Sequence, residues 1–332
     1  MTRKREHAES AGMNCVEICA GAGGQALGLE HAGFDALALV ELDHQACNTL
    51  RINRPHWNIV EKDVKQFSAA DYYGVDLVAG GVPCPPFSVA GKQLGAGDER
   101  DLFPEALRLV DEARPYAVML ENVRGFLDAG FAEYRAGLKK QFHNLGYETD
   151  IRLLQASDYR VSQLRPRVII VAIQRAYADS FRWPQPLVRR PDTVGELLFD
   201  LISANGWELA TDWKQHANRI APTVVGGSKK HGGPDLGPTR AKKAWAQLGI
   251  DGHGIADHAP SSDFAGMPRL TTRMVARIQG FPDEWTFAGK KTAAYRQIGN
   301  AFPPPVATAV ARQIYACLRA SRRVFAAAEL PA

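Results

Sequence analysis

Residues 16–24 read Val16-Glu17-Ile18-Cys19-Ala20-Gly21-Ala22-Gly23-Gly24. The first four residues predict a short strand, and the glycines predict a turn into a helix whose apolar residues recur through residues 26–32. Glycine permits positive φ and a close backbone approach, and the start of a helix offers unpaired N–H groups to a ligand. This order of strand, glycine turn and helix is typical of a nucleotide site at the edge of an α/β sheet.

Acidic residues follow the next two predicted strands. Glu41 ends the apolar run 36–40, where a carboxylate can hydrogen-bond ribose hydroxyls, and Asp63 comes soon after the run 59–60. The glycine spacing differs from the G-x-G-x-x-G pattern of dinucleotide-binding proteins. A ribose and adenine pocket without a phosphate clamp favours S-adenosylmethionine over NAD.

A thiol and a further carboxylate lie beyond two more apolar runs. Cys84 lies in the proline-rich stretch 80–88, directly after the run 75–79, and proline cannot continue a central strand. Glu121 directly follows the run 116–120. Taken singly, such a cysteine is usually structural and such a glutamate is usually exposed or a helix cap. Together they predict a nucleophile and a carboxylate that converge at one edge of a sheet.

The chain resembles a DNA (cytosine-5) methyltransferase of the prokaryotic restriction-modification type, and the resemblance covers nearly its whole length. Its motifs occur in the family's order: a cofactor motif at 15–34, two acids at Glu41 and Asp63, the Pro-Cys motif at 81–88, Glu-Asn-Val at 121–123, Gln-x-Arg-x-Arg at 163–167, the motif that closes the recognition region at 269–282, and a C-terminal cofactor motif at 297–301. Three positions depart from the pattern: Cys19 stands where the family usually has Phe, Pro85 where it often has Gln, and Phe302 where a smaller aliphatic residue is expected.

The resemblance implies a mechanism and a set of site residues. The Cys84 thiolate would add to C6 of cytosine, Glu121 would act at N3, and Arg165 would hold the base carbonyl or its phosphate. S-adenosylmethionine is the implied methyl donor, and no metal is implied. The implied cofactor contacts are Cys19, Gly21, Gly23, Gly24, Glu41, Asp63, Gly81, Pro83 and Asn300.

Double-stranded DNA is the implied substrate, with the target cytosine swung out of the duplex. The glycine-rich stretch 89–97 after Cys84 is expected to close over this base as a lid, although an ordinary surface loop is the alternative. Lysines and arginines of the recognition region can contact phosphates or guanine edges, or belong to a solvated basic loop. Arg167 is equally well a structural ion pair. The residues expected to contact DNA are Ser88, Lys92, Arg167, Lys229, Lys230, Arg240 and Arg273.

The predicted fold is a doubly wound α/β sheet of the S-adenosylmethionine-dependent methyltransferase type with a second, smaller and irregular domain. We expect a flexible tail at 1–12, a catalytic cofactor-binding domain at 13–182, a target-recognition domain at 183–285 and a segment at 286–332 that returns to the catalytic domain. Helices are expected at 102–113 and 131–145, and strands at 147–154 and 168–173. An apolar i, i+4 stripe in 304–319 predicts a helix that packs on the first domain.

Composition limits the remaining possibilities. With 332 residues, of which 45% are hydrophobic, the chain can bury a full core, and its net charge of +4 is compatible with a nucleic-acid partner. Its five cysteines form no C-x-x-C pair, and the loose group His253, Asp257 and His258 indicates polar surface rather than a metal site. Apolar runs are too short to span a membrane, and the N-terminus is charged. We expect a cytoplasmic monomer, functionally linked to a restriction endonuclease.

Two other functions use the same scaffold. One is an RNA (tRNA) cytosine-5 methyltransferase, against which Ser88 and the large segment 183–268 argue mildly. The other is a non-catalytic DNA-binding regulator that uses S-adenosylmethionine, which the presence of Cys84, Glu121 and Arg165 disfavours. A NAD oxidoreductase is disfavoured because its phosphate-binding fingerprint is missing.

Overall fold

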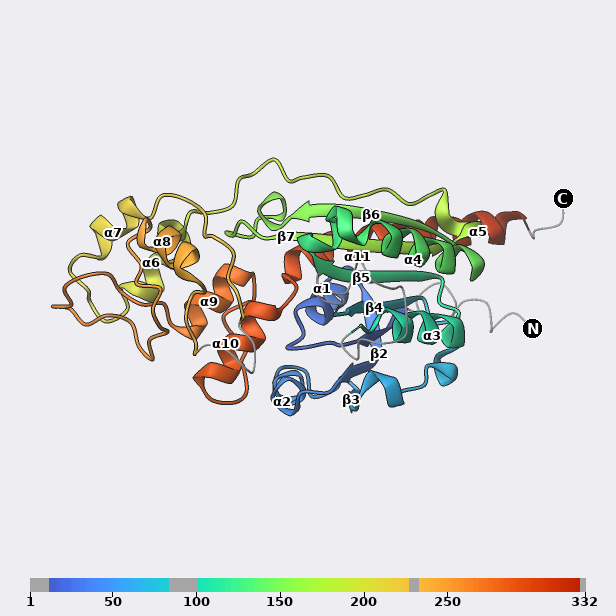
Figure 1. Cartoon of the computed structure of the whole chain (residues 1–332), viewed down its shortest axis with the longest axis horizontal. Coiled ribbons are helices and arrows are strands. Elements are labelled where there is room, and N and C mark those ends of the chain that lie inside the picture. Colours follow the sequence, from blue (N-terminus) through green and yellow to red (C-terminus); the bar gives the residue numbers. More distant parts are fainter. Residues whose placement is uncertain (1–11, 84–100, 227–232, 329–332) are drawn as a thin grey trace.

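The computed structural model describes residues 12–83, 101–226 and 233–328, which form a sheet domain and a second lobe beside it (Figure 1). The sheet has seven strands in the order β3 (Ile59–Glu61), β2 (Phe34–Glu41), β1 (Met13–Ile18), β4 (Leu77–Gly81), β5 (Ala117–Val123), β7 (Pro166–Gln174) and β6 (Tyr147–Gln155). The first five strands are parallel, and β7 is antiparallel to both of its neighbours. The predicted doubly wound α/β fold is confirmed.

The carboxyl ends of the parallel strands meet at one edge of this sheet. Cys19 follows β1, Glu41 ends β2, and Gly81 ends β4. Glu121 lies opposite Gly81 in the ladder between β4 and β5. It is inside β5 rather than beyond it, because β7 pairs with β5 as far as Val123. The strand order therefore brings predicted cofactor and catalytic residues to one place.

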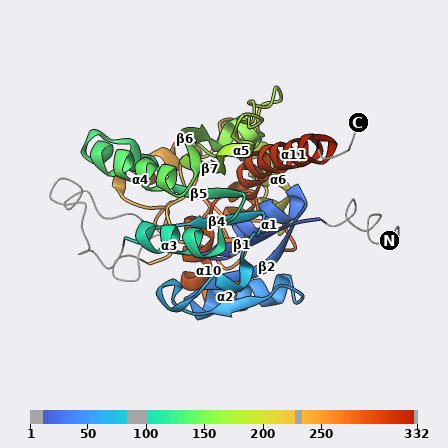
Figure 2. The same ribbon diagram turned by 90° about the vertical axis from the view of Figure 1, so that its right-hand side faces the viewer.

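Helices cover both faces of the sheet (Figure 2). One face carries α3 (Phe103–Ala113) and α4 (Ala132–Asn144), and the other carries α1 (Gly24–Ala32), α5 (Arg175–Ala178) and α11 (Pro304–Ala328). Strand side chains alternate between the two layers: Val118 packs on the first face and Met119 on the second. Both faces are buried, which explains the nearly continuous apolar runs of the central strands. The helices and strands predicted at 102–173 are confirmed with small shifts at their ends.

The C-terminal helix returns to the sheet domain as predicted. The stripe of Val306, Val310, Ile314 and Leu318 is buried in one cluster with residues of the strands and α1. Helices α1 and α11 touch closely, since a Cβ on Gly28 would lie 2.4 Å from that of Ala307. Phe302 is buried in the same cluster, which explains an aromatic ring at that position.

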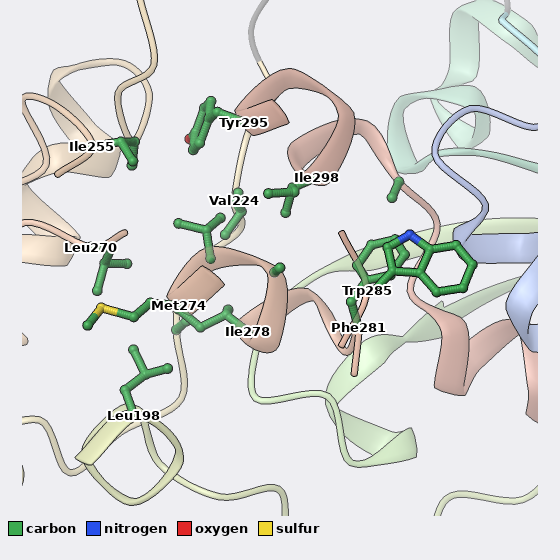
Figure 3. Packing of buried hydrophobic residues seen from close by; sticks show 14 of the residues in the cluster. Leu198, Val224, Ile255, Leu270, Met274, Ile278, Phe281, Trp285, Tyr295 and Ile298 are labelled. Carbon is green, nitrogen blue, oxygen red and sulfur yellow. The ribbon is translucent and has the colours of Figure 1, made fainter. Parts of the chain in front are cut away.

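The second lobe is more regular than predicted. The segment expected to be irregular contains α6 (Val194–Ile202), α7 (Ala210–His216) and α8 (Thr239–Ala246), and the chain continues through α9 (Thr272–Gln279) and α10 (Lys291–Asn300). The lobe core is built on Trp207, Trp213 and Trp245 together with aliphatic residues. Figure 3 shows this cluster, where Leu198 of α6, Met274 of α9 and Ile298 of α10 lie around one interior.

The same cluster joins the two parts of the molecule. It extends to Leu27 of α1 and to Leu50 of α2 (His44–Asn53), so the lobe shares its core with the cofactor side of the sheet domain. Short 3₁₀ turns complete the structure at Val64–Gln66, Ala70–Tyr72, Arg124–Leu127, Ala129–Phe131 and Ala156–Tyr159. No helix within the described ranges is long and apolar enough to cross a membrane.

Candidate active site

A cavity of about 490 Å³ lies at the carboxyl edge of the parallel strands; we call it the edge cavity. Its walls come from β1, β2, β4, β5, α1 and α10, which the chain contributes from both of its ends. Three of the predicted cofactor residues, Gly23, Asp63 and Pro83, are not part of its lining. The predicted residues that line it are Cys19, Gly21, Gly24, Glu41, Gly81, Glu121 and Asn300.

The glycine turn has the conformation that its residues predict. Gly21 and Gly23 have φ of 55° and 86°, in the left-handed region that glycine adopts without strain. A Cβ on Gly24 would lie 2.2 Å from the carbonyl oxygen of Phe302, so only glycine fits there. Cys19 also has positive φ, and burial together with Glu41 and Glu17 raises its pKa to about 12. Its thiol is therefore neutral at physiological pH and is not a nucleophile.

Glu41 fixes the turn to the end of β2. Its carboxylate accepts hydrogen bonds from the backbone N–H groups of Gly21 at 2.7 Å, Leu42 at 2.9 Å and Asp43 at 2.7 Å. A carboxylate can accept about four hydrogen bonds, so capacity remains for a ribose hydroxyl. Asp63 instead caps the first 3₁₀ turn by accepting from the Lys65 N–H at 3.0 Å. The contacts of Glu41 and Asp63 with the cofactor stay predictions.

Glu121 forms an ion pair with Arg167 across the β5–β7 ladder. Its Oε1 lies 2.6 Å from Arg167 Nε, and each side chain is 12% exposed. Burial raises the pKa of Glu121 above its ordinary value, although Arg167 and Arg165 act in the opposite direction. The carboxyl therefore keeps a proton to higher pH than an ordinary glutamate does, which suits a group that donates a proton.

The neighbouring Asn122 holds the start of the Pro-Cys segment. Its side-chain amide donates a hydrogen bond to the carbonyl oxygen of Val82 at 2.9 Å. One residue on, the Pro83 carbonyl accepts from the Leu102 N–H at 3.2 Å. The described residues Pro83 and Leu102, which flank the segment 84–100, are thus joined to each other, and Val82 is held to Asn122. Cys84, Ser88, Lys92 and the expected lid at 89–97 lie outside the described residues.

Arg165 has contacts different from those that the resemblance implied. Its side chain is 1% exposed, and its guanidinium donates to the carbonyl oxygens of Val224 at 2.6 Å, Gly299 at 2.8 Å and Ala301 at 3.1 Å. It does not line the edge cavity, and burial lowers its pKa well below the ordinary value. Arg165 thus joins the main chain at Val224 to the main chain at 299–301, while Arg167 is the arginine that contacts Glu121. The predicted contact of Arg165 with the base stays a prediction.

Gln163 completes this buried junction between the lobe and the sheet domain. Its side-chain N–H₂ donates to Gln279 Oε1 at 2.6 Å, and its own Oε1 accepts from the Val224 N–H at 2.8 Å. Beside it, a Cβ on Gly299 would lie 2.4 Å from the Cα of Gly226. The chain at Gly226 is therefore pressed against α10, which carries Asn300.

The predicted DNA contacts are distributed unevenly. Arg273 forms an ion pair with Asp283 at 2.9 Å, and Arg240 is exposed on α8. Lys229 and Lys230 lie outside the described residues. Sequence reasoning missed a groove of about 1280 Å³ between the lobe and the loop before β7. Its lobe side includes Lys214, Gln215, Asn218 and Arg219.

Glu17 is the principal site residue that sequence reasoning missed. It lines the edge cavity from β1, it is 1% exposed, and neither carboxylate oxygen has a hydrogen-bond partner among the described residues. The signal was present, because Glu17 is the one charged residue of β1 and lies between the apolar residues Val16 and Ile18.

No group of three or more potential metal ligands occurs among residues 12–83, 101–226 and 233–328. His253 contacts Asp251 at 2.7 Å, and Asp257 contacts Lys291 at 3.0 Å, so these polar residues have partners within the protein.

The glycine turn, the acid at the end of β2 and the cavity between them are typical of the S-adenosylmethionine-dependent methyltransferase fold. The family model described as C-5 cytosine-specific DNA methylase matches residues 13–316, and the chain belongs to this family. DNA cytosine is accordingly its substrate and S-adenosylmethionine its methyl donor. The unpartnered Glu17 oxygens and the glycine turn fit a polar cofactor in the edge cavity.

Individual relatives agree with this assignment. The chain is 57% identical over 307 residues to the type II methyltransferase M.NgoMIV of Neisseria gonorrhoeae, covering 92% of this chain and 97% of the relative. It is 56% identical over 312 residues to the type II methyltransferase M.NaeI of Lentzea aerocolonigenes, covering 92% and 75%. A crystal structure of a Spodoptera frugiperda DNMT2 variant superposes with a TM-score of 0.63 over 91% of this chain and 99% of that one, at 15% identity, which is a likeness of fold alone.

Proposed function

We propose that the protein is a sequence-specific DNA (cytosine-5) methyltransferase that acts through a covalent bond between Cys84 Sγ and C6 of a flipped-out cytosine. One observation carries the proposal: the edge cavity connects the glycine turn to Glu121, and Glu121 lies beside the anchored start of the Pro-Cys segment. A methyl donor and a target base can therefore meet at one place.

The chemistry requires a nucleophile because C5 of cytosine is unreactive within its aromatic ring. The Cys84 thiolate forms a bond to C6, and the ring becomes an enamine that is nucleophilic at C5. The bound cofactor supplies the methyl group that C5 takes. A base then removes the C5 proton, the Cys84–C6 bond breaks, and the aromatic ring is restored.

Glu121 has the properties needed at N3 of the base. Addition of the thiolate places negative charge on the ring, and a protonated carboxyl at N3 neutralises it. The burial that raises the pKa of Glu121 keeps this proton available. We assign to Arg167 the task of orienting Glu121, since Arg167 Nε lies 2.6 Å from Glu121 Oε1. Arg165 then acts by holding the lobe against the cofactor motif.

The groove beside the lobe fits a DNA backbone. Lys214 and Arg219 supply positive charge, and Gln215 and Asn218 supply amide groups that can read base edges. We propose that residues 183–285 carry the recognition function. Ser88, Lys92, Lys229, Lys230 and Arg240 remain proposed DNA contacts.

The cellular role follows from the relatives. Those at 56–57% identity are named type II methyltransferases, which supports a protein that works with a restriction endonuclease. We infer that it acts as a monomer, because one chain carries every motif, and in the cytoplasm, where bacterial DNA lies. No metal is required by the proposed steps.

The proposal is tested by methyl transfer from labelled S-adenosylmethionine to unmethylated genomic DNA and, separately, to total tRNA. Label is expected in DNA, and bisulfite sequencing of the product gives the recognised sequence. Cys84→Ala should abolish the transfer, with a loss of roughly four orders of magnitude or more. The matched control Cys317→Ala, a buried thiol on α11, should keep it. Label in tRNA alone would establish the RNA alternative instead.

A further inference from the structure

Trp285 connects the second lobe to the glycine turn of the edge cavity. It follows α9 at the end of the segment 183–285 and is 5% exposed. Its indole N–H donates a hydrogen bond to the carbonyl oxygen of Ala22 at 3.1 Å. Ala22 lines the edge cavity, whereas Trp285 does not. The mechanism proposed above gives this buried indole no task.

The indole ring also packs directly on the turn. A Cβ on Gly23 would lie 2.9 Å from Cζ2 of Trp285. Figure 3 shows Trp285 at the margin of the buried cluster, toward the N-terminal chain drawn in blue. Trp285 therefore touches the turn at two successive residues, with a hydrogen bond to Ala22 and a ring contact at Gly23.

The indole is itself held in one place by its surroundings. The backbone N–H of Trp285 donates to the Pro282 carbonyl at 3.0 Å. Asn53 at the end of α2 binds the next residue twice, because its side chain accepts from the Thr286 N–H at 2.8 Å and donates to the Thr286 carbonyl at 2.7 Å. The Arg54 guanidinium lies over the Trp285 ring, 5.2 Å from its centroid, as a cation–π contact. These contacts keep the indole N–H directed at the turn.

The glycine turn needs such contacts to keep one conformation. Gly21 and Gly23 have positive φ, but glycine adopts negative φ as readily, so an unsupported turn would visit other conformations. Glu41 holds the turn at the Gly21 N–H, and Trp285 holds it at the Ala22 carbonyl. A ligand binds only the competent fraction of a protein, so contacts that raise this fraction raise the affinity.

We propose that Trp285 is a positioning residue for the cofactor: its indole N–H holds the Ala22 peptide in the conformation that receives S-adenosylmethionine. A residue of the second lobe thereby sets the cofactor affinity of the sheet domain. The inference rests on the proposed function, because it takes S-adenosylmethionine as the ligand of the edge cavity. Once the cofactor is bound, it orders the turn itself, so the loss of Trp285 should affect KM for the cofactor rather than kcat.

A matched pair of variants separates this role from a general contribution to stability. Trp285→Phe removes the N–H donor and keeps an aromatic ring. The control is Trp207→Phe, because Trp207 is also 5% exposed, belongs to the same buried cluster and donates its indole N–H to the Phe264 carbonyl at 2.9 Å. That hydrogen bond lies within the second lobe, and neither of its partners lines the edge cavity.

A third variant, Trp285→His, exchanges the two properties. Nε2 of a histidine ring occupies the same position relative to Cβ as the indole Nε1, so histidine can keep the donor while it loses the six-membered ring. A purely structural role predicts that Trp285→His is the worse variant in every respect, because it leaves a larger cavity. The positioning role predicts that it binds the cofactor better than Trp285→Phe does.

The test is isothermal titration calorimetry of the full chain with S-adenosylmethionine and, separately, with S-adenosylhomocysteine. The number of sites in each titration gives the folded fraction of each variant, and urea denaturation gives its stability. Initial rates of methyl transfer to unmethylated genomic DNA at varied S-adenosylmethionine give kcat and KM.

We expect Trp285→Phe to bind both ligands about tenfold more weakly, with a matching rise in KM and a kcat within about twofold of the wild type. Trp207→Phe should lose similar stability and keep wild-type affinity, and Trp285→His should stay within about threefold of it.

Two results would overturn the inference and leave the proposed function intact. One is a Trp285→Phe variant that binds the cofactor as well as Trp207→Phe does. The other is an affinity that follows stability alone, with Trp285→His the weakest binder. Failure of the wild type to bind either ligand would contradict the proposed function itself.

Discussion

The edge of the sheet and the second lobe reach their positions by different means. At the edge, strand pairing decides the geometry: Gly81 lies opposite Glu121, and Arg167 lies opposite Val123 at the start of β7. The lobe is attached by buried side chains instead: the Gln163 and Arg165 side chains are bonded to groups from three distant segments, at Val224, Gln279 and Gly299. Backbone ladders place the proposed catalytic groups, whereas a few polar side chains place the lobe.

This difference explains why one short motif contains residues of two kinds. Within residues 163–167, the first and third residues turn into the junction and Arg167 turns to Glu121. Spacing in a motif therefore does not distinguish a residue that contacts substrate from one that holds the scaffold. Substitutions that affect either the edge of the sheet or the junction with the lobe can distinguish a substrate contact from a scaffold contact.

The largest effect is expected at the edge of the sheet. Glu121→Gln removes the proton donor but keeps the size of the side chain, and kcat should fall by about 10² to 10⁴-fold. Because the raised pKa of Glu121 leaves it protonated at low pH, wild-type activity should decline as pH rises through that pKa. The variant should lack this decline in single-turnover rates measured across pH. An unchanged profile would show that Glu121 does not donate the proton.

A second substitution acts where the two regions touch. In Gly299→Ala the new methyl group would lie 2.4 Å from the Cα of Gly226, so the backbone must move, at a cost of about 1–3 kcal/mol in unfolding free energy. Asn300 follows directly and lines the edge cavity, so cofactor affinity should fall as well. Gly130→Ala has nothing within 4 Å of its new methyl group and serves as the control in urea denaturation and cofactor titration. If the two variants have equal unfolding free energies and equal cofactor affinities, the junction tolerates a displacement of its backbone.

A third effect belongs to the lobe alone. The double variant Lys214→Ala with Arg219→Ala removes two cations from the groove, and DNA binding should weaken roughly tenfold and lose about two units of salt-dependence slope. The control is Arg312→Ala with Arg319→Ala, which removes two exposed cations from α11. Fluorescence anisotropy against salt concentration measures both. If the α11 pair changes the slope and the groove pair does not, the duplex lies elsewhere.

The smallest effect concerns acid stability of the lobe. Arg277 pairs with Asp283 and with Asp200, and hydrogen bonds from Arg277 lower the pKa of Asp283 to about 2. A depressed pKa gives stability that is complete above the ordinary value near 4 and is lost as pH falls toward 2. Solvent screening limits the contribution to about 1 kcal/mol. Thermal melts of the wild type and Asp283→Asn should therefore converge as pH is lowered over this range, and parallel curves would rule the contribution out.

The sheet domain was predictable because its signals are periodic. The apolar runs ending at Glu41 and near Glu121 placed the strands, and the glycine turn predicted the cofactor side of the cavity. Glu17 was overlooked because β1 is buried on both faces. The alternation of side chains along such a strand does not show which of them faces a cavity. The available signal was an ionisable side chain between two apolar residues, Val16 and Ile18.

The lobe was less predictable for a physical reason. Its core depends on a few large side chains, such as Trp213 and Trp245. Their positions in the sequence do not form a regular apolar repeat. The contacts of Arg165 were hidden as well, because its carbonyl partners at 224, 299 and 301 are distant in sequence. Periodicity reports local structure, and only the folded chain brings such residues together.

Arg165→Gln and Arg167→Gln, compared in one experiment, test the separation of the two regions most directly. Each variant is measured for urea denaturation and for the single-turnover rate of methyl transfer at saturating cofactor and DNA. Arg165→Gln should lose about 3 kcal/mol or more of unfolding free energy, because buried carbonyl groups lose their charged donor. Arg167→Gln should keep most of its stability and lose the rate. The opposite result is a stable Arg165→Gln variant without methyl transfer and an active Arg167→Gln variant. It would contradict the account and would indicate that Arg165 contacts the target base.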